Sequence, residues 1–378
     1  MRSKSVVVKS TDELNDVILK FGSEDFSPSL AFVFTSLEQD WNSIGSILKQ
    51  ADIQLFGATS FGAFVRGEYD YDSVAVLFLD MDPATFHLEL FPTQNDNLKG
   101  SVRKLAEKAK AKFDHPCFII SAAHISIQSV SIIEAIQEVC GPDVTIIGGN
   151  ASSSEIAKGF VFNYDEKHEM GLQALIIDEE KIKITGEATS GWKPIGTVKT
   201  VTKCEGNWIY TIDDEPALNH LIKYIGADID FSNEEDLYEK IGNIYPLQVM
   251  HDDGTSTIIP PLFFNEQEKS FMLATPIEVG TKIRFSLPPD FDVIDTVIES
   301  AEYHKKNCME DADALLIFSC AGRNTCLGPM VADEIKGLVD VWDVPSIGFF
   351  TYGEYGKVRN GKPRFHGTTV SWAALKEK

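Results

Sequence analysis

Short apolar runs alternate with amphipathic stretches along this chain, and their order recurs. Apolar runs of about four residues are too short for helices and are typical of buried strands. The stretches between them carry apolar residues at helical spacing, which predicts helices that pack on a sheet. The order strand, helix, strand, glycine-containing turn, strand occurs three times: at residues 31–34, 41–50, 53–56, 57–62 and 74–79; at residues 117–120, 130–139, 144–147, 148–154 and 173–177; and at residues 315–318, 330–339, 346–350, 351–356 and 369–373.

The three copies share small residues at two places. A small polar residue ends each first strand and a glycine ends each second strand: Thr35, Ser121 and Ser319, then Gly57, Gly148 and Gly353. Glycine permits a positive φ or a close approach of the backbone to a ligand. Two interpretations stay open, because an internal repeat and the general preference of strand-end turns for glycine and serine both explain the pattern.

Further strands follow one another without helices between them. Residues 86–91, 181–189 and 197–201 alternate like half-exposed strands. Strands in such a succession pair antiparallel, so the sheets should be mixed. The predicted fold class is α/β with α+β character: mixed sheets flanked by helices, in two halves. The polar, acidic stretch 226–235 is the predicted boundary, with domains at residues 1–228 and 229–378.

The stretch 314–356 brings candidate chemistry to one edge of a predicted sheet. Its two strands, joined by a helix, would lie parallel, with their carboxyl ends at the same edge. Cys320 and Arg323 follow the first strand, and Tyr352 and Glu354 follow the second. Open α/β sheets bind ligands at that edge.

Arg323 and Glu354 together suit an amino-acid zwitterion. A guanidinium can bind a carboxylate through two parallel hydrogen bonds, and Glu354 would accept the ammonium. The alternative is a structural ion pair of Arg323 with Glu354 or Asp343, which a ligand could replace. The turn at 148–154 could form a polar wall, although it lacks the lysine of a phosphate-binding loop. The other predicted ligand-binding residues are Cys320, Tyr352, Gly353, Ser60, Gly149, Asn150 and Trp192; for the two aromatic residues among them, core packing is the alternative.

Composition narrows the classes of function. The chain has 378 residues, of which 43% are hydrophobic, and a formal net charge of −23. Such a charge repels nucleic acid and anionic membranes, so neither is an expected partner. The six cysteines form no C-x-x-C pair and are expected to be reduced thiols. No leader sequence or bilayer-spanning run is apparent, so we expect a soluble cytoplasmic protein without membrane insertion.

Several motifs resemble those of the FIST domain family. C-A-G-R at 320–323 and G-F-F-T-Y-G-E at 348–354 are similar to the C-terminal half of the family, and F-G-A-T-S-F-G at 56–62 is similar to its N-terminal half, with Thr59 and Ser60 in swapped order. The family's motifs are also similar to three further stretches, at residues 147–151, 191–196 and 216–218. The resemblance covers nearly the whole chain. It implies a stand-alone bacterial sensory protein that binds a small ligand, such as an amino acid, in a cleft between its halves and acts through a partner, a histidine kinase or another regulator.

Two alternatives stay open. Some stand-alone FIST proteins resemble haem-binding nitric-oxide sensors that work with a histidine kinase, and His366 or His124 would then be the axial ligand. Otherwise no cofactor and no metal are expected. Cys320 could be the nucleophile of a cysteine-dependent enzyme, but no histidine lies close to it in sequence, and an inert buried thiol is the favoured interpretation. We therefore do not expect an enzyme.

Overall fold

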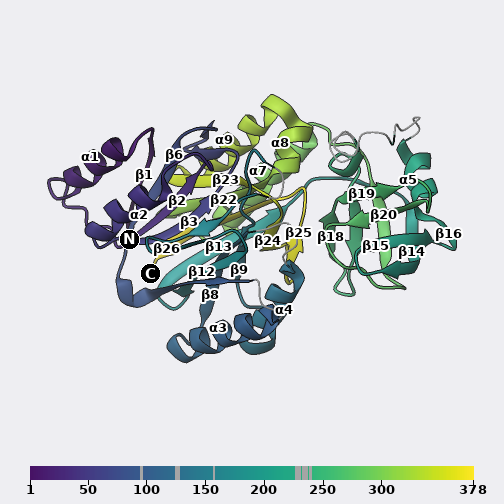
Figure 1. The fold of residues 1–378 in the computed structure, drawn as a ribbon, viewed down its shortest axis with the longest axis horizontal. Helices are drawn as coiled ribbons and strands as arrows, with labels where there is room; N and C mark the ends of the chain where they lie inside the picture. The colour runs from purple at the N-terminus through teal and green to yellow at the C-terminus, as the bar shows by residue number, and fades with distance from the viewer. Residues whose placement is uncertain (94–96, 124–127, 156–157, 226–230, 232–236, 238–240) are drawn as a thin grey trace.

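The computed structural model describes residues 1–93, 97–123, 128–155, 158–225, 231, 237 and 241–378. They form a large lobe, which contains both ends of the chain, and a small lobe on the right of Figure 1. Within these residues, three sheets of six strands each build the large lobe, and a fourth sheet builds the small lobe. The predicted α/β class with mixed sheets is confirmed.

The first sheet contains the first predicted copy. Its strand order is β1-β6-β2-β3-β10-β11, with β2 parallel to β3 and antiparallel to β6. Helices α1 and α2 pack on its outer face. The elements are β1 (Arg2–Val8), α1 (Thr11–Phe21), β2 (Leu30–Thr35), α2 (Trp41–Gln50), β3 (Gln54–Thr59), β6 (Val74–Asp80), β10 (Val161–Phe162) and β11 (Lys167–His168).

The second sheet contains the second copy in the same arrangement. Its order is β25-β24-β9-β8-β12-β7, with β8 parallel to β9 and antiparallel to β12. Helices α3 and α4 pack on its outer face. The elements are η1 (Pro83–Thr85), β7 (Phe86–Pro92), α3 (Leu98–Lys112), β8 (Pro116–Ala122), α4 (Ser129–Cys140), β9 (Ile146–Gly149), β12 (Gly171–Asp178), β24 (Glu354–Lys357) and β25 (Pro363–His366).

The third sheet contains the third copy. Its order is β13-β26-β22-β23-β4-β5, with β22 parallel to β23 and antiparallel to β26. Helices α7 and α9 pack on its outer face. The elements are β4 (Ala63–Val65), β5 (Glu68–Asp70), β13 (Ile182–Thr189), α7 (Asp292–Asn307), β22 (Ala314–Cys320), α8 (Ala321–Leu327), η3 (Gly328–Met330), α9 (Val331–Trp342), β23 (Ser346–Thr351) and β26 (Val370–Glu377).

Each copy gives one hairpin to the sheet of another copy. The hairpin β4–β5 leaves the first copy and pairs with β23 of the third. The hairpin β10–β11 leaves the second copy and pairs with β3 of the first, and β24–β25 leaves the third and pairs with β9 of the second. The exchange closes a cycle, so the three copies are true structural repeats rather than a coincidence of turn residues.

The strand register corrects which glycines correspond. An aromatic residue of each exchanged hairpin lies opposite a glycine of the receiving strand, in the pairs Phe162 and Gly57, Tyr355 and Gly148, and Phe64 and Gly348. A Cβ atom on Gly348 would lie 2.0 Å from the ring of Phe64, and one on Gly57 would lie 2.6 Å from the ring of Phe162. The equivalent residue in the third copy is therefore Gly348, not Gly353 as the sequence pattern predicts. The corresponding first-strand positions are likewise Thr35, Ala122 and Ser319, so Ser121 is one residue out of step.

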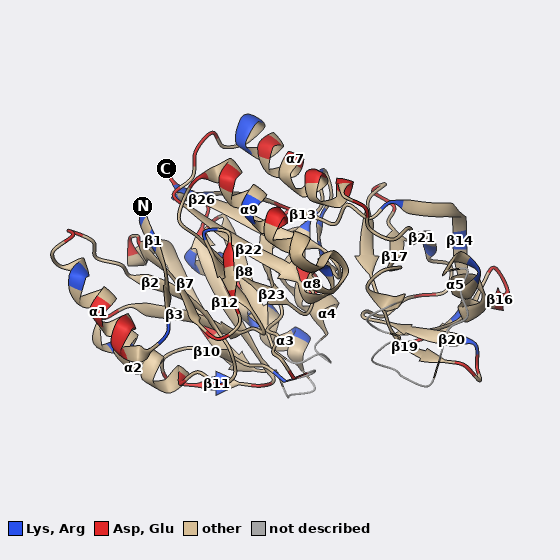
Figure 2. Cartoon of the chain, turned by 90° about the horizontal axis from the view of Figure 1, so that it is seen from above, with Lys and Arg blue, Asp and Glu red and all other residues tan. Residues whose placement is uncertain are grey.

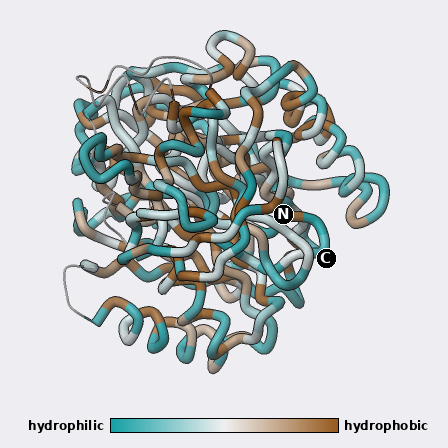
Figure 3. The backbone as a smooth tube through the Cα atoms, turned by 90° about the vertical axis from the view of Figure 1, so that its right-hand side faces the viewer, coloured by the Kyte–Doolittle hydropathy of each residue, from teal (hydrophilic) through white to brown (hydrophobic). Residues whose placement is uncertain are grey.

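The inner faces of the three sheets meet in one apolar core. Strand β2 is buried on both of its faces, which explains why its sequence is apolar throughout. Phe32 and Phe34 point into the central core, whereas Ala31 and Val33 face helices α1 and α2. The ring of Phe34 lies 4.2 Å from the ring of Phe349 of the third sheet, measured between centroids. Strands buried on both faces read as continuous apolar runs. In Figure 3 the hydrophobic segments accordingly gather inside the molecule and the hydrophilic ones toward its rim.

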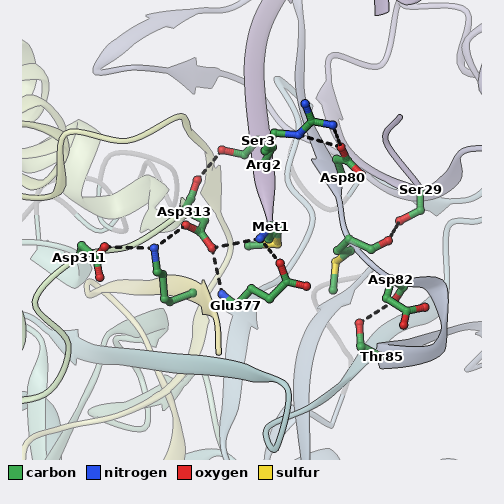
Figure 4. A network of polar contacts seen from close by, with 12 residues as sticks. Met1, Arg2, Ser3, Ser29, Asp80, Asp82, Thr85, Asp311, Asp313 and Glu377 are labelled. Atoms are coloured by element: carbon green, nitrogen blue, oxygen red, sulfur yellow. Dashed lines mark hydrogen bonds and ion pairs between the residues drawn. The ribbon is translucent and has the colours of Figure 1, made fainter. Parts of the chain in front are cut away.

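The ends of the first and third sheets are tied together by polar contacts (Figure 4). The hydroxyl of Ser3 in β1 donates to the carbonyl of Asp313, which precedes β22. The carboxylate of Asp313 accepts from the backbone N–H of Glu377 at 2.9 Å and pairs with Lys376 at 2.9 Å. Asp313 therefore links three strand ends at this side of the large lobe.

The small lobe is inserted between β13 and α7 of the third repeat. Its sheet has the order β18-β17-β21-β14-β15-β20-β19, with β16 beside β15, and its own apolar core, to which α5 contributes. The predicted boundary between residues 228 and 229 lies outside the described residues and stays a prediction. The elements are β14 (Pro194–Glu205), β15 (Trp208–Ile212), β16 (Glu215–Pro216), α5 (Ala217–Ile225), β17 (Leu247–Met250), β18 (Ser256–Ile259), β19 (Pro261–Asn265), β20 (Ser270–Leu273) and β21 (Lys282–Ser286).

Helices α1, α2 and α7 carry many of the charged residues, as Figure 2 shows. The described part of the chain contains no helix that is both long and apolar enough to cross a bilayer.

Candidate functional site

A cavity of about 790 Å³ lies between the two lobes. Its large-lobe wall is built from residues that end or directly follow the parallel strands: Ser36 after β2, Ser60 after β3, Asn150 after β9, Cys320 at the end of β22 and Tyr352 after β23. The carboxyl ends of all three repeats therefore converge on one cavity, at the edge where α/β sheets usually bind ligands.

The small lobe supplies the opposite wall. Leu262 and Phe263 of β19 line the cavity, as does Asn243, which precedes β17. The lobes also touch beside the cavity, where the N–H of Gly367 donates to the carbonyl of Ile258 at 2.7 Å. A ligand in this cavity would contact both lobes.

Five of the residues predicted for the ligand site line this cavity. They are Ser60, Asn150, Cys320, Tyr352 and Gly353. The residues just before Arg323 contain the last two residues of β22, Ser319 and Cys320, and the start of α8.

Arg323 is not positioned as predicted. Its side chain is fully buried and its Nε donates to Glu334 Oε1 of α9 at 2.9 Å, forming an ion pair in which both side chains are 0% exposed. Its Nη1 donates to the carbonyls of Ser190 at 2.6 Å and Thr368 at 3.2 Å. The expected pair with Glu354 or Asp343 is therefore not formed. Other residues of α8 line the cavity, but Arg323 is not among them.

Two further residues predicted for the ligand site, Trp192 and Gly149, are packed within the protein and do not line the cavity. The indole of Trp192 is 4% exposed, lies 5.1 Å below the Arg323 guanidinium and donates to the carbonyl of Ile244 at 3.1 Å. A Cβ on Gly149 would lie 2.4 Å from the methyl group of Thr351. Core packing, the alternative for Trp192, is what the structure shows.

Glu354 lies buried behind Cys320. The hydroxyl of Thr351 and the backbone N–H of Thr369 donate to its carboxyl group, and the Cys320 thiol is a further partner. Burial nevertheless raises the pKa of Glu354 to about 8, because these hydrogen bonds offset only part of the loss of solvation. Burial also raises the pKa of the Cys320 thiol far above its usual value, with the nearby Glu354 acting in the same direction. Both groups are therefore neutral at pH 7.

A second network holds the wall around Asn150 in place. The Asn150 side chain accepts from the hydroxyl of Tyr355 at 2.8 Å and donates to Ser129 Oγ at 3.3 Å. The hydroxyl of Tyr352 donates to the carbonyl of Ser153 at 2.8 Å. These contacts join the second and third repeats, so the wall is preformed.

Two polar atoms in the wall lack a partner among the described residues. They are Oδ1 of Asn243, whose residue is 1% exposed, and Oγ of Ser36, whose residue is 7% exposed. A buried acceptor without a donor costs about 1–3 kcal/mol.

The sequence analysis did not predict the residues of the small-lobe wall. Asn243, Leu262 and Phe263 lie in stretches that read as ordinary strands and turns, and no motif marks them. Tyr71 of the first repeat also lies outside the motifs, and its ring stacks at the cavity with that of Phe61, which belongs to the motif at 56–62, with 6.2 Å between the ring centroids. Only the packing of one lobe against the other makes these residues part of a site.

The described lining does not fit a haem ligand. Among the described residues that line the cavity there is no histidine. His366 is 1% exposed and does not face the cavity, and burial lowers its pKa to about 3. His124 lies outside the described residues. We therefore derive no haem chemistry from the residues of this cavity.

The model of the FIST N domain matches residues 29–215, and the model of the FIST C domain matches residues 217–357. Together they cover nearly the whole chain. No curated protein matches the sequence.

Proposed function

This chain belongs to the FIST family of sensory domains of signal-transduction proteins, and on that premise we propose that it is a cytoplasmic sensor that binds a small molecule between its lobes. The bound state would be recognised by a partner regulator, such as a histidine kinase. The observation that carries this proposal is the cavity of about 790 Å³ with one wall from each lobe. Its volume lies in the range of small-molecule pockets.

The position of the cavity suggests how binding becomes a signal. A ligand shifts a conformational equilibrium only by its difference in affinity for the two states. Here a ligand that touches Tyr352 on one wall and Phe263 on the other is bound best when the lobes are close together. The free energy of binding would then favour one arrangement of the lobes, which a partner can recognise.

An amino acid would have to bind differently from the predicted way. The Arg323 guanidinium is held by Glu334, and the described lining contains no arginine and no lysine. A carboxylate in the cavity would depend on hydroxyl, amide and backbone donors alone. We propose binding rather than catalysis, because a Cys320 thiol with a strongly raised pKa is a poor nucleophile.

The test is a thermal-shift screen of small metabolites against the wild type and Phe263→Ala. A ligand that binds only the folded form raises the melting temperature. Phe263 is 44% exposed and lines the cavity, so its loss should reduce the shift without unfolding the protein. Phe291→Ala is the matched control, since Phe291 is 73% exposed and lies outside the lining.

The two variants separate the outcomes. We expect hits whose shift is diminished in Phe263→Ala and unchanged in Phe291→Ala. Hits that shift the wild type and both variants equally would place binding elsewhere and overturn the proposed site.

A further inference from the structure

The chain passes between the two lobes twice, through two adjacent segments. Residues 190–193 lead from β13 into the small lobe, and residues 287–291 lead back from β21 to α7. The segments are tied to each other, because the N–H of Leu287 donates to the carbonyl of Lys193 at 2.9 Å and Lys193 Nζ pairs with Asp290 at 2.9 Å. Hinges between domains usually consist of a few such residues at the ends of elements.

Arg323 holds the first of these segments. Its Nη1 donates to the carbonyl of Ser190, the first residue after β13, at 2.6 Å. The same nitrogen donates to the carbonyl of Thr368 at 3.2 Å, beside Gly367, which contacts the small lobe. The buried ion pair with Glu334 of α9 fixes the guanidinium in turn. One buried side chain therefore joins the large lobe to the segment through which the chain leaves it.

Trp192, in the same segment, is held from both lobes. The Arg323 guanidinium lies 5.1 Å from the centroid of its ring, within the range of a cation–π contact. Its indole N–H donates to the carbonyl of Ile244, just before β17, at 3.1 Å. Its own carbonyl accepts from the side chain of Gln248 in β17 at 2.9 Å. Trp192 thus connects Arg323 of the large lobe with β17 of the small lobe.

Arg323 also belongs to the helix that forms part of the cavity wall. Four other residues of α8 line the cavity: Ala321, Gly322, Asn324 and Thr325. Coupling between sites travels through packed side chains and hydrogen bonds of this kind. A ligand that displaces α8 would therefore disturb the contacts of Arg323 with Ser190 and Trp192.

Other contacts between the lobes are weaker or depend on the same arginine. The ion pair of Arg364 with Asp253 is partly exposed, and exposed ion pairs contribute little stability. The hydrogen bond from Gly367 to Ile258 lies next to Thr368, whose carbonyl Arg323 holds. The buried contacts around Arg323 should therefore dominate the arrangement of the lobes.

We propose that Arg323 and Trp192 form a hinge lock, which holds the two lobes in the arrangement that encloses the cavity. The lobes turn relative to each other only when the contacts of Trp192 on one of its two sides break. Gly191 lies between the two held residues, Ser190 and Trp192, and has a φ of 82°. Its backbone freedom makes it the place where the chain turns after release. The inference goes beyond the proposed function, because the lock acts in the free protein.

The experiment measures the distance between the lobes by electron–electron resonance of two spin labels on the full chain. One label is attached to Cys308 at the end of α7 and the other to Val279→Cys in the small lobe, because both positions are exposed. The three half-buried cysteines are first replaced by alanine: Cys140, Cys204 and Cys326. A rotation of about 15° moves a point about 20 Å from the hinge by roughly 5 Å, which such labels resolve.

Two changes release the lock from different sides. Trp192→Leu removes the ring over Arg323 and the indole N–H. Arg323→Met combined with Glu334→Leu replaces the buried ion pair by apolar side chains, an exchange that proteins often tolerate. Each should give a longer and broader distribution of distances than the otherwise identical protein with the lock intact.

Trp342→Leu is the matched control. Trp342 is also a buried tryptophan of the large lobe, and its N–H has no partner among the described residues. This variant should keep the narrow distribution. Gln248→Leu decides the question if neither lock variant folds, as judged by circular dichroism, because it removes only the hydrogen bond to the Trp192 carbonyl and should also broaden the distribution.

The outcomes separate this inference from the proposed function. A folded lock variant that keeps the distances of the intact protein would overturn the hinge lock, as would equal broadening in Trp342→Leu. None of these measurements needs a ligand. The hinge lock can therefore fail while the metabolite screen still yields ligands of the cavity, and it can be confirmed when the screen yields none.

Discussion

At the scale of single residues, the surroundings of a side chain decided its role. Arg323 follows a strand at the ligand edge of a sheet, yet its guanidinium lies buried against Glu334, eleven residues further along the chain. Breaking a buried ion pair leaves an uncompensated charge and costs about 3–5 kcal/mol. A ligand carboxylate would therefore have to displace Glu334 at that cost. This explains why a residue type suited to carboxylate binding serves here to fix α8 to α9.

Glu354 gives a prediction on pH dependence. Its pKa is raised from the usual 4.5 to about 8 in the folded protein. Between these values the unfolded chain loses this proton while the folded protein keeps it, so its contribution to stability falls as the pH rises from about 4.5 to about 8. Over this pH range the free energy of unfolding of the wild type should fall relative to that of Glu354→Gln. The fall should be roughly 1.4 kcal/mol for each unit by which the pKa of Glu354 differs between the folded and the unfolded protein.

Urea denaturation of the wild type and of Glu354→Gln from pH 4 to pH 9 measures the difference between their free energies of unfolding. The other titrating groups are the same in both proteins, so their contributions cancel in this difference. A difference between wild type and Glu354→Gln that stays constant, or grows with pH, would show that Glu354 is ionised in the folded protein.

At the scale of elements, the exchanged hairpins hold the three repeats together. Each places an aromatic residue opposite a glycine of a neighbouring repeat's strand: Phe162 opposite Gly57, Tyr355 opposite Gly148 and Phe64 opposite Gly348. A Cβ would meet the aromatic ring at Gly57 and Gly348, and at Gly148 it would lie 1.9 Å from the carbonyl oxygen of Ile120. Interiors are close-packed, so these glycines are required for space rather than for backbone conformation alone. The exchange also explains why the strand ends of all three repeats reach one cavity.

Gly348→Ala tests this role. A Cβ at that position would lie 2.0 Å from the ring of Phe64 and 2.2 Å from the carbonyl oxygen of Ile317. Overpacking of this kind costs about 1–3 kcal/mol or more. We therefore expect a lower melting temperature, with faster amide exchange in the hairpin β4–β5 as the sign that it detaches.

Gly22→Ala is the matched substitution, because a Cβ there meets nothing within 4 Å and the backbone is helical. It should change the free energy of unfolding by no more than about 0.5 kcal/mol. If the Gly348→Ala protein were as stable as the wild type, β4 and β23 could move apart at no cost in free energy. That result would contradict the close packing of Phe64 against Gly348.

At the scale of the whole molecule, two separate apolar cores support the two lobes. The core of the small lobe comes from residues between Val201 and Phe285, and the three-sheet core comes from the large lobe. Contacts between the lobes are comparatively polar, such as the ion pair of Arg364 with Asp253 at 2.9 Å. Interfaces of this kind allow relative motion of domains. With a core of its own in each lobe, we expect the two lobes to unfold as separate units.

Hydrogen exchange followed by mass spectrometry can test this division. Phe271 is fully buried in the core of the small lobe, and Phe271→Ala should destabilise that lobe by about 3–5 kcal/mol. Exchange should become faster in residues 194–225 and 247–286 and stay unchanged in β2, β8 and β22. Phe118→Ala in the second sheet should give the reverse pattern. A uniform increase across both lobes in either variant would show one cooperative unit instead.

The sequence was sufficient to predict much of the large lobe and part of the candidate site. The three apolar strand pairs, the helices between them and the residues after the strands follow from local periodicity, and Ser60, Asn150, Cys320 and Tyr352 do line the cavity. The partner of Arg323 was not predictable, because ion pairs depend on where α9 packs. The small-lobe wall was not predictable either, because nothing local distinguishes Phe263 from other strand residues.

The sequence by itself determined the elements: their type, their order, the mixed pairing and the recurrence of one layout, because these depend on side-chain periodicity within about ten to fifteen residues. Only the tertiary structure decided which repeat receives which hairpin, which acid neutralises Arg323 and which lobe closes the cavity. Those outcomes depend on contacts between residues far apart along the chain, such as Gly348 with Phe64. No local pattern encodes them, because each becomes favourable only when the remaining elements are already in place.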